Sequence, residues 1–361
     1  MDRPTLFAHD ELRVRGGAEA ALLEVAEVAN ERGPVSLALM FEGPRRSYDG
    51  DQLSTFDRVL QLRFPRSMRP RQASRYAQQL RALRRAIADA GQAVAFGWGS
   101  AFRLALAGLG TGTALAWSCL LDPPYNRGRW GGAKDRAALQ LMARAGMRIA
   151  CTCDTAREAF LAGGYPARLL TTIPNAVDLA RLRTQSEGTP HWPLEGRAGM
   201  RLLCLARLDG NKNQELLIRA VAACRRRGVN VALACVGGEN PLWPEYRQTL
   251  AGLRASLDVA DRVALIEEQS SVAPWLHSAD AAVLASHSES GMPRALLEAG
   301  AAGLPLLASH AGGMPELVQP GLTGALFDAR DVEDCADAIC TLARDAQLRT
   351  RCGSLAAETI R

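Results

Sequence analysis

Short apolar runs alternate with amphipathic helical stretches along the chain, and this alternation restricts the fold more than any other feature. Strand-like runs occupy 35–43, 92–99 and 147–153 in the first half, and 201–206 and 280–286 in the second. Strands that alternate with helices pair in parallel through right-handed crossovers. The pattern therefore predicts an α/β chain with doubly wound parallel sheets, which bind ligands at the carboxyl ends of their strands.

Chain length and a break in periodicity indicate two domains. A chain of 361 residues allows about two domains of ordinary size, each with its own core. The stretch 179–198 loses the apolar period and mixes polar residues with prolines and glycines. We expect a Rossmann-like domain over 1–180, a linker over 181–198 and a second Rossmann-like domain over 199–361.

The stretch 286–328 carries the clearest functional pattern. It reads as a loop, a helix, a buried strand, a Gly-Gly loop and a second short strand, and the acids Glu289 and Glu298 bracket the turn 291–293 before the helix. Free N–H groups at a helix N-terminus attract anions such as phosphate. Glu298, about one turn into the helix, can accept hydrogen bonds from ribose hydroxyls. This combination suits a sugar nucleotide.

A second pattern places two cations, Arg207 and Lys212, in a loop between an apolar strand and the helix near 214–228. Fixed cations in such a loop can bind an anion such as phosphate. Lys212 is one of two lysines among the 43 basic residues. Taken alone, the pair would be interpreted as a solvated loop. Its position between strand and helix favours a binding site.

Both patterns resemble those of retaining GT-B glycosyltransferases of the group usually called family 4 (glycosyltransferase group 1). Members commonly show Ser-x-x-Glu-Gly-x-Pro-x-x-Leu-Leu-Glu-Ala, and the matching residues here are Ser286, Gly291, Pro293, Leu296, Leu297, Glu298 and Ala299. Counted back from Glu298, the first glutamate of that motif falls on Ser290, one residue after Glu289. Either the loop carries an insertion or Ser290 replaces the glutamate. We favour the insertion, because Ser286 and Glu289 keep the expected spacing.

The resemblance implies a fold, a reaction and a set of site residues. The fold is GT-B, two facing Rossmann-like domains, and the reaction moves a hexose from a nucleoside diphosphate sugar to a hydroxyl acceptor with retention, in bacterial glycan, polysaccharide or glycolipid synthesis. Arg207, Lys212 and Glu289 would be catalytic. The donor-binding set would comprise Gly16, Gly17, Arg207, Lys212, Glu267, Glu289, Ser290, Gly291, Met292, Pro293, Leu297 and Glu298. No metal or further cofactor is expected, because the fixed cations supply the electrostatic stabilisation.

The first half contributes less to this resemblance. Gly16 and Gly17 begin a Gly-Gly-Ala-Glu segment similar to one with which relatives line the cleft from the first domain. Many relatives carry a histidine after the strand that here lies at 113–121, yet this chain has none between His9 and His191. The task of that histidine is unassigned.

Two rival functions stay open. One is a same-fold enzyme with other chemistry, such as a nucleotide-sugar epimerase or a phosphorylase. The other is a non-catalytic protein that binds sugar nucleotides or membranes, which the displaced glutamate and the absent histidine favour. Release of nucleoside diphosphate that depends on an acceptor would separate the transferase from the epimerase, and retained nucleotide affinity without turnover would support the non-catalytic protein.

The net charge of +5 is unevenly distributed. Residues 58–87 hold nine arginines and no acid, and Tyr76, Leu80, Leu83 and Ile87 fall on one helical face within them. The segment is either a core-packing helix with a solvated basic face or a surface that docks on anionic lipid, where each basic residue adds ~1 kcal/mol. No aromatic interleaving or known motif supports nucleic acid.

The cysteines and the hydropathy favour a cytoplasmic protein, with peripheral attachment to the inner face of the plasma membrane as the alternative that 58–87 suggests. The nine cysteines are odd in number, lack a Cys-x-x-Cys pair and mostly fall in apolar runs, which predicts buried, reduced thiols and no metal site. No charged-then-apolar leader opens the chain. The uncharged run 104–121 is long enough for a membrane span, but its Gly- and Thr-rich interior favours a buried helix–turn–strand.

Overall fold

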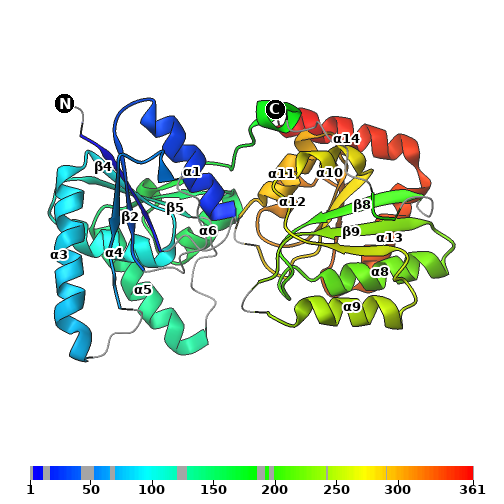
Figure 1. Cartoon of the computed structure of the whole chain (residues 1–361), viewed down its shortest axis with the longest axis horizontal. Coiled ribbons are helices and arrows are strands. Elements are labelled where there is room, and N and C mark those ends of the chain that lie inside the picture. Colours follow the sequence, from blue (N-terminus) through cyan, green and yellow to red (C-terminus); the bar gives the residue numbers. More distant parts are fainter. Residues whose placement is uncertain are drawn as a thin grey trace. The chain divides into compact units, whose positions relative to one another are not determined.

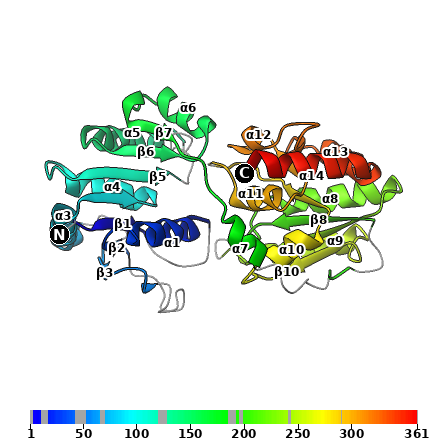
Figure 2. The same cartoon turned by 90° about the horizontal axis from the view of Figure 1, so that it is seen from above.

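The computed structural model describes residues 3–10, 17–41, 53–65, 70–119, 128–184, 192–194, 199–240, 243–289 and 291–360. The chain divides into two compact units, Met1–Pro174 and Asn175–Arg361. Each unit is a parallel sheet with helices packed around it (Figure 1, Figure 2). The predicted α/β class, with two Rossmann-like domains, is confirmed.

The first unit contains a seven-stranded sheet in the order β3-β2-β1-β4-β5-β6-β7. Its strands are β1 (Thr5–His9), β2 (Val35–Leu39), β3 (Arg58–Gln61), β4 (Gln92–Ala95), β5 (Ala114–Cys119), β6 (Arg148–Cys151) and β7 (Leu170–Thr172). Its helices are α1 (Gly17–Asn30), α3 (Ala73–Asp89), α4 (Trp98–Gly108), α5 (Gly128–Arg144) and α6 (Asp154–Ala162), with short 3₁₀ turns at Pro70–Gln72 and Ala167–Leu169. The strand order reverses between β1 and β4, which pair in parallel from Thr5 to Ala8.

The second unit contains a six-stranded sheet in the order β10-β9-β8-β11-β12-β13. Its strands are β8 (Met200–Leu205), β9 (Val231–Val236), β10 (Val263–Ile266), β11 (Ala281–Leu284), β12 (Leu306–Ser309) and β13 (Gly324–Phe327). Its helices are α7 (Leu179–Thr184), α8 (Gln214–Arg226), α9 (Tyr246–Ser256), α10 (Ala273–Ser278), α11 (Arg294–Ala301), α12 (Met314–Leu317), α13 (Val332–Arg344) and α14 (Ala346–Ile360). Here the order reverses between β8 and β11, so the crevice that such sheets offer to ligands lies after these two strands.

Burial explains why the strands of the second unit are readable from sequence. Every residue of β9, β11 and β12 is buried, as expected for parallel strands covered by helices on both faces. The core of the second unit is mostly aliphatic, and its buried aromatic residues are Trp192, Tyr246, Trp275 and Phe327. All nine cysteines are free and buried, which confirms the predicted burial, and desolvation by burial raises the pKa of the Cys151 thiol to about 11.

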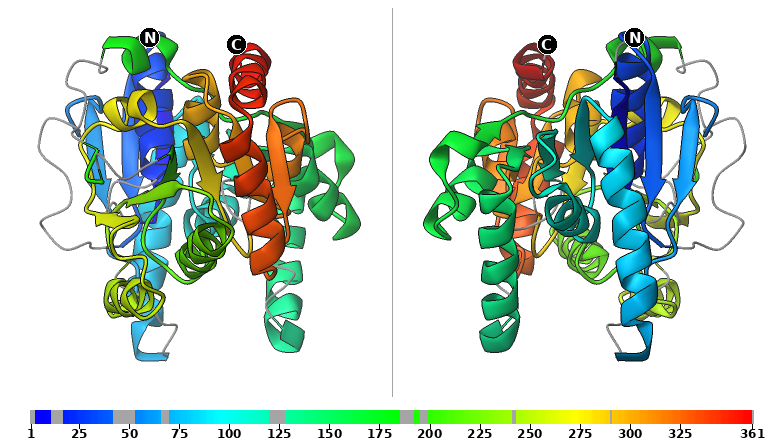
Figure 3. Two further views of the ribbon diagram at one scale, coloured as in Figure 1. Left: turned by 90° about the vertical axis from the view of Figure 1, so that its right-hand side faces the viewer. Right: turned by 90° about the vertical axis from the view of Figure 1, so that its left-hand side faces the viewer.

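The basic segment 58–87 begins with a strand, so interpreting the segment as one helical run was wrong for its first part. Residues Arg58–Gln61 form β3, which pairs with β2 at the edge of the sheet and is exposed at three of its four positions. An edge strand with one open side needs no apolar run. The helical part is confirmed: α3 covers Ala73–Asp89, buries Leu83 and Ile87, and lies at the front of the first unit in the right-hand view of Figure 3.

The two units divide six residues before the boundary expected at 180, between Pro174 and Asn175. The physical reason is packing. Asn175 Nδ2 donates to the carbonyl oxygen of Met292 at 2.8 Å, and the side chains of Val177 and Leu182 pack against the core of the second unit. The start of the expected linker is therefore helix α7 of that unit, while 185–191 and 195–198 lie outside the described residues.

The uncharged run 104–121 is a buried helix end followed by a turn and a strand, as predicted. Its first residues end α4, and 114–119 form β5. Leu104 and Ala105 are fully buried inside the first unit. Across the described residues, no helix combines the length and the apolar character that a membrane crossing requires.

Candidate functional site

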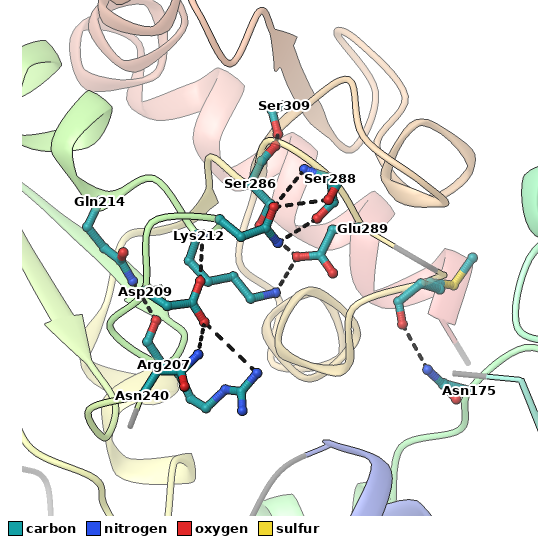
Figure 4. Close-up of polar contacts among 12 residues, drawn as sticks. Asn175, Arg207, Asp209, Lys212, Gln214, Asn240, Ser286, Ser288, Glu289 and Ser309 are labelled. Carbon is teal, nitrogen blue, oxygen red and sulfur yellow. Dashed lines mark hydrogen bonds and ion pairs between the residues drawn. The ribbon is translucent and has the colours of Figure 1, made fainter. Parts of the chain in front are cut away.

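The candidate site is formed by two loops that follow β8 and β11, the neighbouring strands at which the strand order of the second sheet reverses (Figure 4). We call 206–213 the cation loop, because it carries Arg207 and Lys212. We call 285–289 the glutamate loop, because it ends at Glu289. The sequence predicted both loops as parts of the site, and the structure brings them into direct contact.

Lys212 and Glu289 form an ion pair across the two loops. Lys212 Nζ contacts Glu289 Oε1, and the side chains are only 20% and 13% exposed. The same carboxylate oxygen accepts a second hydrogen bond from Ser286 Oγ, at 2.6 Å. Both residues singled out from sequence on separate grounds therefore meet at one point, which fits Glu289 as the acid of the displaced motif.

Asn211 fastens the two loops together. Its carbonyl oxygen accepts from the backbone N–H of His287 at 2.8 Å, and its Nδ2 donates to the carbonyl oxygen of Ser288 at 2.9 Å. Its Oδ1 accepts from both the backbone N–H and the hydroxyl of Ser288, at 3.2 and 3.0 Å. Sequence reasoning missed this residue. Its only signal was its place inside the cation loop.

Asp209 is a buried residue of the cation loop that accepts hydrogen bonds from within the loop and from Asn240. It is 3% exposed, and its Oδ1 accepts the backbone N–H of Lys212 at 3.1 Å while its Oδ2 accepts from Asn240 Nδ2 at 3.2 Å. Arg207 Nη2 lies 3.9 Å from the same Oδ2, with half of the arginine side chain exposed. A buried carboxylate thus binds the backbone at Lys212 and lies beside the guanidinium of Arg207. Sequence analysis did not assign it a role.

The loop after β12 packs closely against the backbone of the glutamate loop. Gly312 has φ +53°, and a Cβ on it would lie 2.1 Å from the carbonyl oxygen of Glu289. The next residue, Gly313, donates its N–H to the carbonyl oxygen of Gly291 at 3.0 Å. The Gly-Gly loop predicted from sequence therefore has a definite use: only a residue without a side chain allows this approach.

Helix α11 starts beside this point and carries Glu298. Pro293 precedes it in an extended conformation, and Arg294 Nη2 lies 3.7 Å from Glu298 Oε1 one turn along. Both side chains are less than a fifth exposed. Leu297, predicted as a donor contact, has its side chain 4% exposed in the hydrophobic core of the second unit.

The remaining predicted residues lie apart from the ion pair or outside the described residues. Glu267 is exposed after β10, where its carbonyl oxygen accepts from Gln269 Nε2 at 3.1 Å, and no described contact joins it to Lys212 or Glu289. Gly17 is the first residue of α1 in the first unit. Gly16 and Ser290 are outside the described residues.

The loop after β5, where the missing histidine was expected, spans 120–127 and lies outside the described residues. Trp117 is 1% exposed, and its ring centroid lies 5.5 Å from that of Trp98 in a tilted pair and 5.7 Å from that of Phe160 in an edge-to-face pair, which makes it a core residue. At the reversal between β1 and β4, Asp10 accepts the N–H of Gly99 at 3.1 Å in the first turn of α4. Sequence reasoning missed Asp10, which directly follows the predicted first strand.

Three or more His, Cys, Asp or Glu side chains arranged to hold a metal ion are not found within the described ranges. The groups at the described site are one lysine, one half-exposed arginine, carboxylates and hydroxyls. Such a set can bind a polyanion through its cations and sugar hydroxyls through its carboxylates.

Comparison with known proteins finds a match to a protein family within the second unit. Residues 199–345 match the family model described as "Glycosyl transferases group 1". The chain is 32% identical over 214 residues to a GDP-mannose-dependent alpha-(1-6)-phosphatidylinositol monomannoside mannosyltransferase of Mycobacterium tuberculosis, covering 56% of this chain and 54% of that protein. It is 34% identical over 221 residues to a D-inositol 3-phosphate glycosyltransferase of Actinosynnema mirum, covering 58% and 52%. The chain thus spans about half the length of these curated relatives.

Solved structures extend the fold likeness to the whole chain. The crystal structure of Anabaena HepE in complex with UDP matches with a TM-score of 0.81 at 19% identity, covering 100% of this chain and 94% of that one. The glycosyltransferase WaaG, involved in lipopolysaccharide biosynthesis, matches with a TM-score of 0.70 at 16% identity, covering 99% and 95%. At these identities the likeness establishes the GT-B fold that was expected from sequence.

Proposed function

We propose, from the membership of residues 199–345 in the group 1 glycosyltransferases, that the chain is a retaining glycosyltransferase that uses a nucleoside diphosphate sugar. It moves the sugar to a hydroxyl of a glycan or glycolipid acceptor. The observation that carries the proposal is the Lys212–Glu289 ion pair after β8 and β11. A phosphate cation and a sugar-binding carboxylate meet there at the edge where doubly wound sheets bind ligands.

Each charged group has a task in this reaction. Arg207 and Lys212 hold the donor diphosphate and stabilise the charge that it gains as the glycosidic bond breaks. Asp209 orders the loop that carries both cations, because it accepts the backbone N–H of Lys212 and lies beside the Arg207 guanidinium. Glu289 accepts hydroxyls of the donor sugar, and Glu298 accepts those of the ribose.

The uncharged parts of the site supply the rest. The turn Gly291–Met292–Pro293 presents backbone N–H groups at the start of α11 to a phosphate. The loop after β10, with Glu267, borders the base. Transfer proceeds on one face of the sugar without an obligatory nucleophile, and the anomeric configuration is retained. The fixed cations perform the task that a metal performs in other transferases.

The test of this assignment is calorimetric titration of the purified chain with UDP, GDP, ADP and their common sugars. One diphosphate series is expected to bind with micromolar affinity. Arg207→Ala should weaken that binding by about tenfold or more, because a charge-assisted contact to phosphate is lost. The matched control is Arg219→Ala, an exposed arginine on α8, which should bind as the wild type does. No binding by any member of the panel would contradict the proposal.

We further propose that the basic face of α3 brings the enzyme to anionic lipid on the inner face of the plasma membrane. Arg75, Arg81 and Arg85 are exposed on α3, whose buried residues are Leu83 and Ile87. The relatives named for phosphatidylinositol monomannoside and inositol 3-phosphate support a lipid-linked or polyol acceptor. A fourth arginine, Arg84, is engaged with the carbonyl oxygens of Ala107 and Leu109 and serves the fold instead.

Vesicle sedimentation tests the membrane proposal. The wild-type chain should pellet with vesicles of one-third anionic lipid and stay in the supernatant with neutral phosphatidylcholine. The triple change of Arg75, Arg81 and Arg85 to glutamine should remove about 3 kcal/mol of binding, at ~1 kcal/mol per basic residue. Equal sedimentation of the variant and the wild type would reject α3 as the docking face.

A further inference from the structure

We propose that Ser286 is a positioning residue: its hydroxyl holds the Glu289 carboxylate in place when a donor diphosphate takes Lys212 away from it. The inference rests on the proposed function of the site. Ser286 is the first residue of the Ser-x-x-Glu segment, and its hydroxyl donates to the carboxylate of Glu289.

Glu289 Oε1 has two donors from two different loops. One is Lys212 Nζ from the cation loop, and the other is Ser286 Oγ at 2.6 Å from the glutamate loop itself. Figure 4 shows the Lys212 side chain reaching the Glu289 carboxylate, with Ser286 close by. When no sugar nucleotide is bound, the Glu289 side chain therefore has two contacts, the ion pair with Lys212 and the hydrogen bond from Ser286.

The two donors differ in what a diphosphate would do to them. A nucleoside diphosphate carries more negative charge than one carboxylate, and its oxygens compete for the lysine. Lys212 can serve the diphosphate only by leaving Glu289 or by sharing its protons between the two anions. Ser286 carries no charge, so a diphosphate attracts its hydroxyl much less strongly than it attracts the Lys212 ammonium group. After the exchange, Ser286 is the donor that stays with Glu289.

Ser286 itself is firmly placed. It is 0% exposed, and its carbonyl oxygen accepts the hydroxyl of Ser309, the last residue of β12, at 2.6 Å. The Glu289 backbone is fixed separately by the close approach of Gly312. With the backbone fixed, the direction of the carboxylate depends on the hydroxyl of Ser286. That direction decides whether it meets the sugar hydroxyls.

The test is Ser286→Ala, measured by binding and by turnover. Affinity for the nucleoside diphosphate alone should stay within about twofold of wild type, because Lys212 and Arg207 are intact. Affinity for the intact sugar nucleotide and kcat should both fall by about tenfold or more, the usual effect of losing a hydrogen bond to a charged group. Ser286→Thr retains the hydroxyl and should recover most of the loss.

Ser354→Ala is the matched control. It makes the same change at an exposed serine of α14, outside both loops of the site. Its turnover should remain within about twofold of wild type. A thermal melt of each variant separates misfolding from a local effect, because a merely structural role for Ser286 would lower stability and diphosphate affinity together.

The outcomes distinguish this inference from the proposed function. Wild-type binding of a diphosphate combined with unchanged sugar-nucleotide affinity and kcat in Ser286→Ala would overturn the positioning role alone. An equal loss of affinity for the diphosphate and for the sugar nucleotide would overturn it as well. Absence of diphosphate binding by the wild type would instead overturn the proposed function from which the inference starts.

Discussion

Lys212→Ala is expected to lower sugar transfer by about two to three orders of magnitude while the protein remains folded. The change removes a cation from the oxygen atoms on which charge develops, and the loss of one such donor has effects of this size. It also removes one of the two donors on Glu289 Oε1. Lys212 lies in a loop with a fifth of its side chain exposed, so its truncation leaves no cavity in the core.

The chain contains its own control for this experiment. Lys134, the only other lysine, is exposed on α5. Lys134→Ala should transfer sugar at the wild-type rate, and both variants should show the wild-type far-UV circular dichroism and melting profile. Wild-type turnover in Lys212→Ala would remove Lys212 from the leaving-group site and with it the interpretation of the cation loop.

Gly312→Ala is expected to destabilise the second unit and to abolish most of the transfer. The left-handed φ of +53° costs a residue with a side chain about 1–2 kcal/mol, and the new Cβ would lie 2.1 Å from the Glu289 carbonyl oxygen. The contact cannot be tolerated without a shift of the glutamate loop. A shift of about 1 Å in a positioning loop can cost a hundredfold in rate. Denaturant unfolding and steady-state kinetics measure the two effects.

Gly303→Ala separates backbone strain from the clash. Gly303 has φ +84°, but a Cβ on it meets nothing within 4 Å. This variant should lose stability through strain alone, about 1 kcal/mol, and should keep its transfer rate. If Gly312→Ala and Gly303→Ala behaved alike in turnover, the close approach of Gly312 to Glu289 would have no role in the site.

The sequence is informative about the second sheet because its strands are buried on both faces. Strands such as β9 and β11 are uniformly apolar runs, and each is followed by a helix with a clear period. Strand β3 escaped prediction for the opposite reason. It is an exposed edge strand, RVLQ, whose polar ends carry no periodic signal, and it lies directly before an arginine-rich helix. Tertiary pairing with β2, not local pattern, makes it a strand.

The sequence predicted site residues that belong to a short local motif. It did not predict contacts between residues that are far apart in the chain. Lys212 and Glu289 were each singled out by type and spacing, yet their ion pair joins residues 77 positions apart. The same separation hides the four hydrogen bonds between Asn211 and the glutamate loop. Asp209 was overlooked because an acid between two basic residues is usually expected to be exposed on the surface, and its burial is visible only in the structure.

Release of nucleoside diphosphate from its sugar, followed with and without an acceptor, tests the central claim most directly. The donor is the sugar nucleotide that binds in the calorimetric panel. The acceptors are D-inositol 3-phosphate and vesicles that contain phosphatidylinositol monomannoside, chosen from the names of the relatives. Release is expected only when an acceptor is present, and NMR should show that the transferred sugar keeps its anomeric configuration. Tight binding of the donor with no acceptor-dependent release across a broadened acceptor panel, or a product of inverted configuration, would contradict it.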